Sequence, residues 1–194
     1  MKNKEMHSDI KLLGSLSTLH TKLHESNSTK DKVAVLEAVA GGDVELLKLL
    51  SYMYDPYKQY YSSWKNILKR DDLHRYFNGT IFNLLDILND RMVTGHDALG
   101  LINDYRSKVN NDQMLELVFS RSLKARVDAK LINRVFPGLI PTFDVALATK
   151  YEDFAKRFDP TEDRWMWSRK LDGVRVLMRI ENGTVKYFSR QGKE

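Results

Sequence analysis

The sequence predicts an α+β protein in which an all-helical region, residues 1–141, precedes the first strands of a second region, residues 142–194. Apolar residues recur at the three- and four-residue spacing of helices from Ser8 to about Val135. After Pro137 the pattern changes and becomes strict alternation, which is typical of strands. The alternating segments flank Asn182-Gly183, a pair that favours a two-residue hairpin turn.

Apolar stripes and helix-capping residues locate the individual helices. The first two stripes consist of Leu12, Leu16, Leu19 and Leu23 and of Val33, Leu36 and Val39. Asp43 is a good N-cap for a third helix, which Pro56 ends. The mixture of aromatic and basic residues in YKQYYSSWKNIL, residues 57–68, suits a helix that lies against the edge of a groove. Further helices are expected over residues 81–89, 96–108, 113–122 and 128–135.

The strand signal begins near the C-terminal end of the sequence. Val174, Val176, Met178 and Ile180 alternate with Arg175, Leu177, Arg179 and Glu181, and TVKYFSR follows the turn as a returning strand. A two-stranded hairpin is marginally stable alone in water. The second region is therefore expected to be a truncated domain that begins a larger sheet.

Composition excludes several classes of protein. The sequence has no cysteine, which excludes disulfides, thiolate metal sites and a cysteine nucleophile. No apolar run approaches the roughly 20 residues that span a bilayer, and the N-terminus lacks the apolar core of a signal peptide, so we expect a cytoplasmic protein without a membrane partner. The net charge of +5 permits an anionic partner. The five histidines are scattered, and no metal site is predicted.

The segment RKLDGVR, residues 169–175, raises the question of whether Lys170 is a surface cation or a nucleophile. Most lysines are solvated, which is the simpler interpretation. An Asp-Gly turn between this lysine and Arg175 would place an amine and a guanidinium on one rim, a pair suited to a polyphosphate. A nucleophilic lysine needs nearby cations or desolvation to favour its free amine. Arg169 and Arg175 could supply that bias.

KLDGVR resembles the lysine-x-Asp-Gly-x-Arg signature of the covalent nucleotidyltransferases, which comprise ATP-dependent DNA ligases, RNA ligases and mRNA capping enzymes. FSRQGKE resembles the Ser-Arg-x-Gly segment that follows the lysine in DNA ligases. INRVFPGLIP is similar to the junction between the helical DNA-binding domain and the adenylation domain of phage-type and bacterial ATP-dependent DNA ligases. YKQYYSSW and TGHDALGLINDY resemble stretches of that helical domain. The resemblance covers about residues 46–194.

The resemblance implies a role for each residue of these motifs. Lys170 matches the catalytic lysine that attacks the α-phosphate of ATP and carries AMP to the 5′-phosphate of a nick, which the 3′-hydroxyl then closes. Arg175 is implied to hold the nucleotide and the reacting phosphates. Arg190 is implied to contact the 5′-phosphate, and Asp172 and Gly173 to shape the nucleotide site. Planar guanidinium groups suit both phosphate-binding tasks.

The implied cofactors are ATP and Mg²⁺, and the implied partner is nicked duplex DNA, bound by a monomer that acts in DNA replication, repair and recombination. In the family, the ligands of the metal and the OB-fold domain follow later in the chain, and this sequence lacks them. The chain is therefore expected to be the N-terminal part of a ligase that does not ligate alone. Ser168 stands where DNA ligases usually carry Glu or Gln facing the adenine, so adenine selection by that side chain is in question.

A basic cluster in the helical region is the candidate DNA-binding surface. Residues 121–134 contain five cations and one carboxylate, Asp128. A charge run is usually a solvated face, whereas the family's helical domain grips the phosphate backbone without reading sequence. Related ligases often have glycines near Lys124-Ala125-Arg126, so side-chain contacts are expected to replace backbone-amide contacts here. The predicted DNA-binding residues are Arg121, Lys124, Arg126, Lys130 and Arg134.

Two alternatives to a ligase stay open from the sequence. A free-standing DNA-binding module would use the helical region without any ligation. An RNA ligase would share the lysine signature, although RNA ligases do not generally carry a helical domain that ends in FPGLIP.

Overall fold

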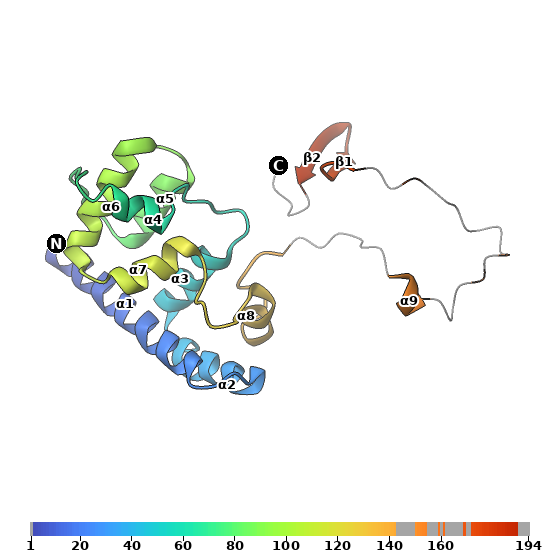
Figure 1. Ribbon diagram of the computed structural model, residues 1–194, viewed down its shortest axis with the longest axis horizontal. Coiled ribbons are helices and arrows are strands. Elements are labelled where there is room, and N and C mark those ends of the chain that lie inside the picture. Colours follow the sequence, from blue (N-terminus) through green and yellow to red (C-terminus); the bar gives the residue numbers. More distant parts are fainter. Residues whose placement is uncertain are drawn as a thin grey trace. The chain divides into compact units, whose positions relative to one another are not determined.

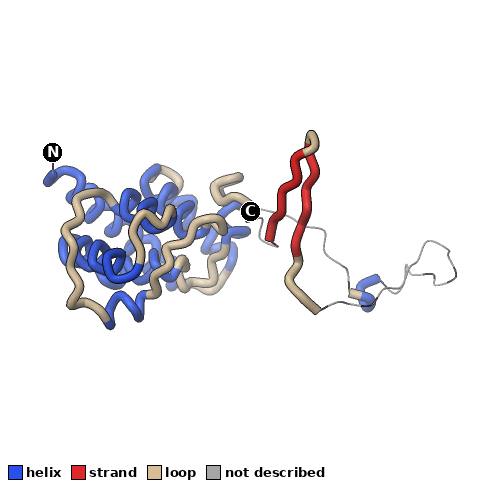
Figure 2. The backbone as a smooth tube through the Cα atoms, turned by 90° about the horizontal axis from the view of Figure 1, so that it is seen from above, coloured by secondary structure: helices blue, strands red, loops and turns tan. Residues whose placement is uncertain are grey.

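The computed structural model describes residues 2–142, 150–154 and 172–189, together with Asp159, Thr161 and Arg169. The chain divides into two compact units, Met1–Pro141 and Thr142–Glu194. The first is helical, and the described part of the second contains a short helix and a two-stranded sheet (Figures 1 and 2). The predicted α+β class is confirmed.

The helices of the first unit fall close to the predicted ranges. Those predicted from residue 81 onward are confirmed to within one or two residues at either end. The helices are α1 (Lys2–His24), α2 (Thr29–Ala40), α3 (Val44–Tyr54), α4 (Trp64–Lys69), α5 (Ile81–Asn89), α6 (Gly95–Val109), α7 (Asp112–Ser120) and α8 (Ala129–Val135).

Helix α1 runs along one side of this unit and packs against α2, α3, α6 and α7 (Figure 1). Its predicted leucine stripe is buried, with Leu16 and Leu19 fully removed from solvent. Burying a leucine side chain stabilises a fold by roughly 1.5–3 kcal/mol, so this stripe is a major source of stability.

Short polar side chains begin most of these helices, as the sequence indicates. Asp43 accepts a hydrogen bond from the Leu46 amide (3.0 Å), as predicted. Thr80 and Asn83 form a reciprocal capping box at the start of α5. The side chains that cap a helix in this way are Ser28, Asp43, Ser63, Thr80, Asn111 and Asp128.

The helix predicted over YKQYYSSWKNIL is wrong in its first half. Only Trp64–Lys69 is helical, and residues 57–63 are irregular. The backbone amides of Tyr57 and Gln59 bond instead to the side chains of Asp55 (2.8 Å) and Asn89 (3.0 Å). Since these amides have side-chain partners, the segment needs no helix to satisfy them.

A buried carboxylate joins three helices. Asp9 of α1 accepts hydrogen bonds from the Ile81 amide of α5 and from the Tyr105 hydroxyl of α6, both at 2.8 Å. Burial, followed by the charge of Asp9, raises the pKa of the Tyr105 phenol far above its ordinary value. The hydroxyl therefore stays protonated and acts as a donor, which ties α1 to the α5–α6 pair.

The second unit contains α9 (Tyr151–Phe154) and a hairpin of β1 (Val176–Glu181) and β2 (Thr184–Ser189) (Figure 2). Glu181 pairs with Thr184, so Asn182 and Gly183 form the two-residue turn, with φ of 49° and 76°. Positive φ at both positions is typical of a type I′ turn, and the predicted hairpin is confirmed. One face of this hairpin carries exposed apolar side chains that include Val176, Met178 and Tyr187.

We expect replacement of Asp9 by alanine to destabilise the helical unit by about 2–5 kcal/mol, because each buried polar group left unpaired costs roughly 1–3 kcal/mol. Urea unfolding followed by the circular dichroism of the helices measures the loss. Glu37→Ala, an exposed carboxylate on α2, is the control and should change stability by about 0.5 kcal/mol or less. Equal stability of the two variants would contradict the anchoring role of Asp9.

Candidate nucleic-acid interface

We call the segment between α7 and α8, residues 121–128, the basic loop. From residue 123 to residue 128, buried apolar residues alternate with exposed charged residues. Leu123, Ala125 and Val127 are buried, whereas the residues between them are exposed. The apolar side chains therefore fix the loop to the helical unit, and Lys124 and Arg126 extend into solvent.

Three residues of the basic loop adopt the left-handed backbone region without being glycine. The φ angles are 54° at Arg121, 51° at Lys124 and 55° at Arg126. A residue with a β-carbon pays roughly 1–2 kcal/mol for this conformation, which glycine adopts freely. This chain carries cations at these three positions.

Two side chains from distant helices hold the backbone of the basic loop. The Tyr54 hydroxyl of α3 donates to the Val127 carbonyl and accepts from the Leu123 amide, both at 3.0 Å. The Lys32 ammonium of α2, which is buried, donates to the Ala125 carbonyl at 2.5 Å. Burial raises the pKa of the Tyr54 phenol from its ordinary value, while the Leu123 amide opposes that shift. The phenol therefore remains a donor at neutral pH.

Arg121 has a different position from the other predicted DNA-binding residues. It is half-buried, and its guanidinium donates to the main-chain carbonyls of Met53, at 3.3 Å, and Asp55. These bonds tie the start of the basic loop to the end of α3. In this structure Arg121 anchors the loop, and a contact with DNA by this residue stays a prediction.

The remaining four predicted residues are exposed. Lys124 forms an ion pair with Glu116 of α7 at 2.5 Å, and Lys130 and Arg134 stand one helical turn apart on α8. Within the described part of the chain, Arg126, Lys130 and Arg134 form no ion pair.

The single carboxylate of the cluster serves as a helix cap. Asp128 accepts from the Leu131 amide at 2.8 Å at the start of α8. Its charge is therefore directed at the helix terminus. The exposed surface of the cluster is accordingly dominated by cations.

Asn133 of α8 holds the turn that leads out of the helical unit. Its amide group bonds to the Ile140 carbonyl (2.7 Å) and to the Ile140 amide (2.8 Å), and Gly138 in the intervening turn has a φ of 77°. Residues 133–140 of the motif INRVFPGLIP thus form a closed turn at the end of the helical unit.

The predicted nucleotide site is only partly visible. Asp172, Gly173 and Arg175 are exposed and lie in the segment that leads into β1. Lys170 and Arg190 lie outside the described residues, as does Ser168. The three described residues thus lie within four positions of one another, immediately before β1.

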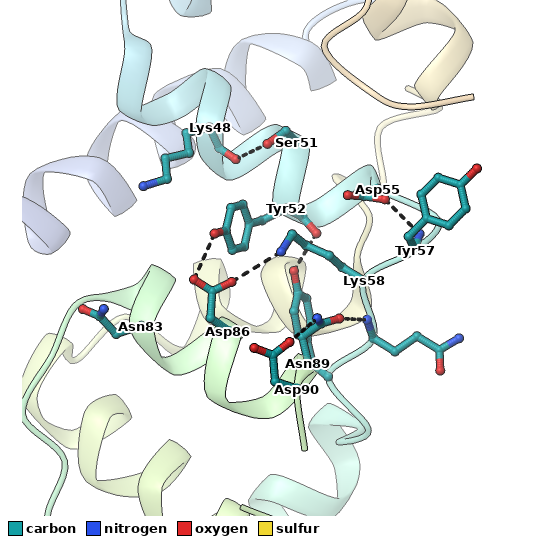
Figure 3. A network of polar contacts seen from close by, with 12 residues as sticks. Lys48, Ser51, Tyr52, Asp55, Tyr57, Lys58, Asn83, Asp86, Asn89 and Asp90 are labelled. Atoms are coloured by element: carbon teal, nitrogen blue, oxygen red, sulfur yellow. Dashed lines mark hydrogen bonds and ion pairs between the residues drawn. The ribbon is translucent and has the colours of Figure 1, made fainter. Parts of the chain in front are cut away.

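Sequence reasoning missed a polar cluster of Tyr52, Lys58 and Asp86, which joins α3 to α5 (Figure 3). The Asp86 carboxylate accepts from the Tyr52 hydroxyl (3.1 Å) and pairs with Lys58 (3.3 Å), and the Lys58 ammonium lies 4.1 Å from the centre of the Tyr52 ring. Burial, followed by the bond to Asp86, raises the pKa of Tyr52 to about 12. Lys58 is therefore engaged in an ion pair with the partly exposed Asp86 carboxylate.

The described residues offer neither a metal site nor a membrane-spanning helix. They contain no group of three or more His, Asp or Glu side chains arranged to hold a metal ion. None of the helices seen in them combines the length and the apolar character needed to cross a membrane.

The chain is similar in sequence and in structure to known proteins. It is 28% identical over 198 residues to the DNA ligase of enterobacteria phage T4, and equally to that of phage T6. The match covers 95% of this chain and 38% of each ligase. Two solved structures, titled Pmar-Lig_Pre and Pmar-Lig_PreS3, match 92% of the chain with TM-scores of 0.67 and 0.65, at 25% and 24% identity, over 42% of their own lengths. No model of a known protein family matches the sequence.

Over most of its length the chain is similar to DNA ligases. The chain is a relative of the phage DNA ligases and corresponds to their N-terminal part. It spans about two fifths of the length of the relatives that it matches.

We expect Tyr54→Phe to lower the stability of the helical unit by about 1–3 kcal/mol, because it leaves the Leu123 amide and the Val127 carbonyl without their partner. The free energy of opening measured by hydrogen exchange at the Leu123 amide should fall by the same amount, so this amide should exchange faster. Tyr76→Phe removes a hydroxyl from an exposed tyrosine and is the control. If Leu123 exchanges at the wild-type rate in Tyr54→Phe, the hydroxyl does not hold the loop.

Proposed function

We propose that this chain is the N-terminal portion of an ATP-dependent DNA ligase and that its helical unit binds nicked duplex DNA through the basic loop and α8. The observation that carries the proposal is the alternation of the loop, which buries Leu123, Ala125 and Val127 and exposes cations between them. The similarity to the phage ligases over 95% of the chain supports it.

The proposed contacts suit binding without sequence preference. Lys124 and Arg126 stand on a backbone held at fixed points, so the cost of ordering them is reduced when a phosphate arrives. Lys130 and Arg134 add two charges from the adjacent helix. Contacts of this kind go to the phosphate backbone, which positions a protein on the duplex and carries no base information directly.

The proposed chemistry follows the lysine signature. The Lys170 amine attacks the α-phosphorus of ATP, a phosphorus–nitrogen bond forms and pyrophosphate leaves. The 5′-phosphate at the nick then displaces the lysine and takes the AMP. Attack by the 3′-hydroxyl closes the backbone and releases AMP. Arg175 and Arg190 are proposed to hold phosphate oxygens through these steps, with Asp172 and Gly173 shaping the turn beside the lysine.

Mg²⁺ is implied by this chemistry, and the described residues provide no set of carboxylates that fits it. We therefore assign no step to the metal. Its ligands are proposed to belong to the part of the relatives that this chain does not match. On the same ground, we propose that the 194-residue chain does not seal nicks alone.

Replacement of Lys124 and Arg126 by alanine is expected to weaken the binding of all duplex sequences alike. The plot of log affinity against log salt should become shallower by roughly one to two units, because each phosphate neutralised contributes a slope of about −0.9. Fluorescence anisotropy at several salt concentrations measures both effects.

Two controls separate charge from loop conformation. Lys65→Ala with Lys69→Ala removes two exposed cations from α4 and should leave the slope unchanged. Lys124→Gly with Arg126→Gly removes the same charges as the alanine pair, so it should bind DNA as weakly. Because glycine adopts the left-handed backbone freely, the glycine pair should be more stable than the alanine pair by about 1 kcal/mol or more for each position. An unchanged slope in the alanine pair would place the DNA surface elsewhere.

A chain extended through the region that follows in the relatives should form a lysyl-AMP on Lys170. Incubation with labelled ATP and Mg²⁺, followed by peptide mapping, locates the label. Lys170→Ala should abolish labelling, because no other amine occupies the signature position, and Lys186→Ala of β2 should retain it. AMP transfer to the Lys170→Ala variant would refute the assignment.

A further inference from the structure

The helical unit contains a polar cavity of about 280 Å³ that neither the basic loop nor α8 lines. Its wall is formed by the segment that follows α4, the C-terminal half of α6 and the start of α7. Most of the side chains on this wall carry oxygen atoms that accept hydrogen bonds. They include Asp71, Asn103, Ser107, Asn110 and Asp112.

Asn103 of α6 is buried at this cavity and has one polar atom without a partner. The residue is 2% exposed, and its Nδ2 donates to the main-chain carbonyls of Arg70 (2.7 Å) and Leu73 (3.1 Å). Because carbonyl groups only accept, these two bonds fix which end of the amide is nitrogen. The Asn103 Oδ1 is buried and has no hydrogen-bond partner among the described residues. Buried acceptors ordinarily have a donor, so a bound group that donates would complete the site.

The charges around the cavity leave one carboxylate uncompensated. Arg106 donates from Nε and Nη2 to the two carboxylate oxygens of Asp112, at 2.7 and 2.8 Å. Asp71 is exposed and forms no ion pair within the described part of the chain. The cavity also includes the C-terminal end of α6, where helix carbonyls favour a cation. A ligand with a single positive charge therefore matches the cavity.

We propose that this cavity binds a small primary alkylammonium ion, which donates to Asn103 Oδ1 and balances the charge of Asp71. An ammonium group has three N–H donors, so one remains for the Ser107 hydroxyl, whose own proton goes to the Asp104 carbonyl at 2.8 Å. A divalent metal ion fits less well, because Arg106 is on the wall and occupies one of the two carboxylates. The inference is independent of the proposed DNA-binding function.

The test is a titration of the isotopically labelled 194-residue chain with methylammonium chloride, followed by nuclear magnetic resonance at the side-chain amide of Asn103. Tetramethylammonium is the matched control, because it carries the same charge and has no N–H donor. We expect saturable shifts with methylammonium and none with tetramethylammonium. A ligand of two non-hydrogen atoms should bind with a Kd of about 5 mM or weaker. The ionic strength is held constant, and the pH is 8, at which imidazole groups such as that of His74 on the wall are ordinarily neutral.

Two variants locate the binding. Asp71→Asn keeps the size of an exposed side chain on the wall and removes its charge, so it should weaken methylammonium binding roughly two- to fivefold. Glu37→Gln removes an exposed carboxylate that does not line the cavity and should leave the Kd unchanged.

Three results would overturn the inference. Asn103 resonances that do not respond to methylammonium would mean that water alone serves Oδ1. Equal responses to methylammonium and tetramethylammonium would reflect charge without hydrogen bonding. Wild-type affinity in Asp71→Asn would remove the proposed counter-charge. Each of these results leaves the DNA-binding proposal intact.

Discussion

The Tyr54 hydroxyl is the contact on which the proposed DNA surface depends. It joins the amide of Leu123 to the carbonyl of Val127, and Lys32 holds the carbonyl of Ala125 between them. These bonds satisfy backbone groups that would otherwise be buried without partners. They also determine which residues point inward and therefore which side chains reach solvent.

The same arrangement explains why a strained backbone persists. Lys124 and Arg126 occupy a conformation that favours glycine, and the cost is of the order of 1–2 kcal/mol for each residue. Buried apolar contacts of Leu123 and Val127 and the bonds from Tyr54 offset that cost. Under the proposed function, the benefit is a pair of cations carried at fixed positions. A glycine loop in the same conformation would present only amides.

Local sequence signals predicted much of the fold because their partners are close in the chain. The leucine stripe of α1, the Asp43 cap and the Asn182-Gly183 turn each depend on residues within a few positions. Other features depend on distant partners. Asp9 bonds to residues 72 and 96 positions away, and residues 57–63 lose their predicted helix because Asn89 and Asp55 take their amides.

The candidate site shows the same limit. The cluster of cations in residues 121–134 is visible in the sequence, and so is the lysine signature. The sequence does not show that Arg121 has a structural role while the other four cations are exposed. That role comes from carbonyl groups at the end of α3, which are distant in the sequence. Lys32 and Tyr54 carry no local signal at all, since an isolated lysine on a helix is ordinarily a solvated charge.

The most direct test of the account is a map of the surface that contacts DNA. Amide resonances of the isotopically labelled chain can be followed by nuclear magnetic resonance during titration with a nicked duplex at low salt. The account predicts that the largest shifts fall in the basic loop and α8. Shifts confined to the face around Tyr52 and Asp86, with the basic loop unchanged, would contradict it.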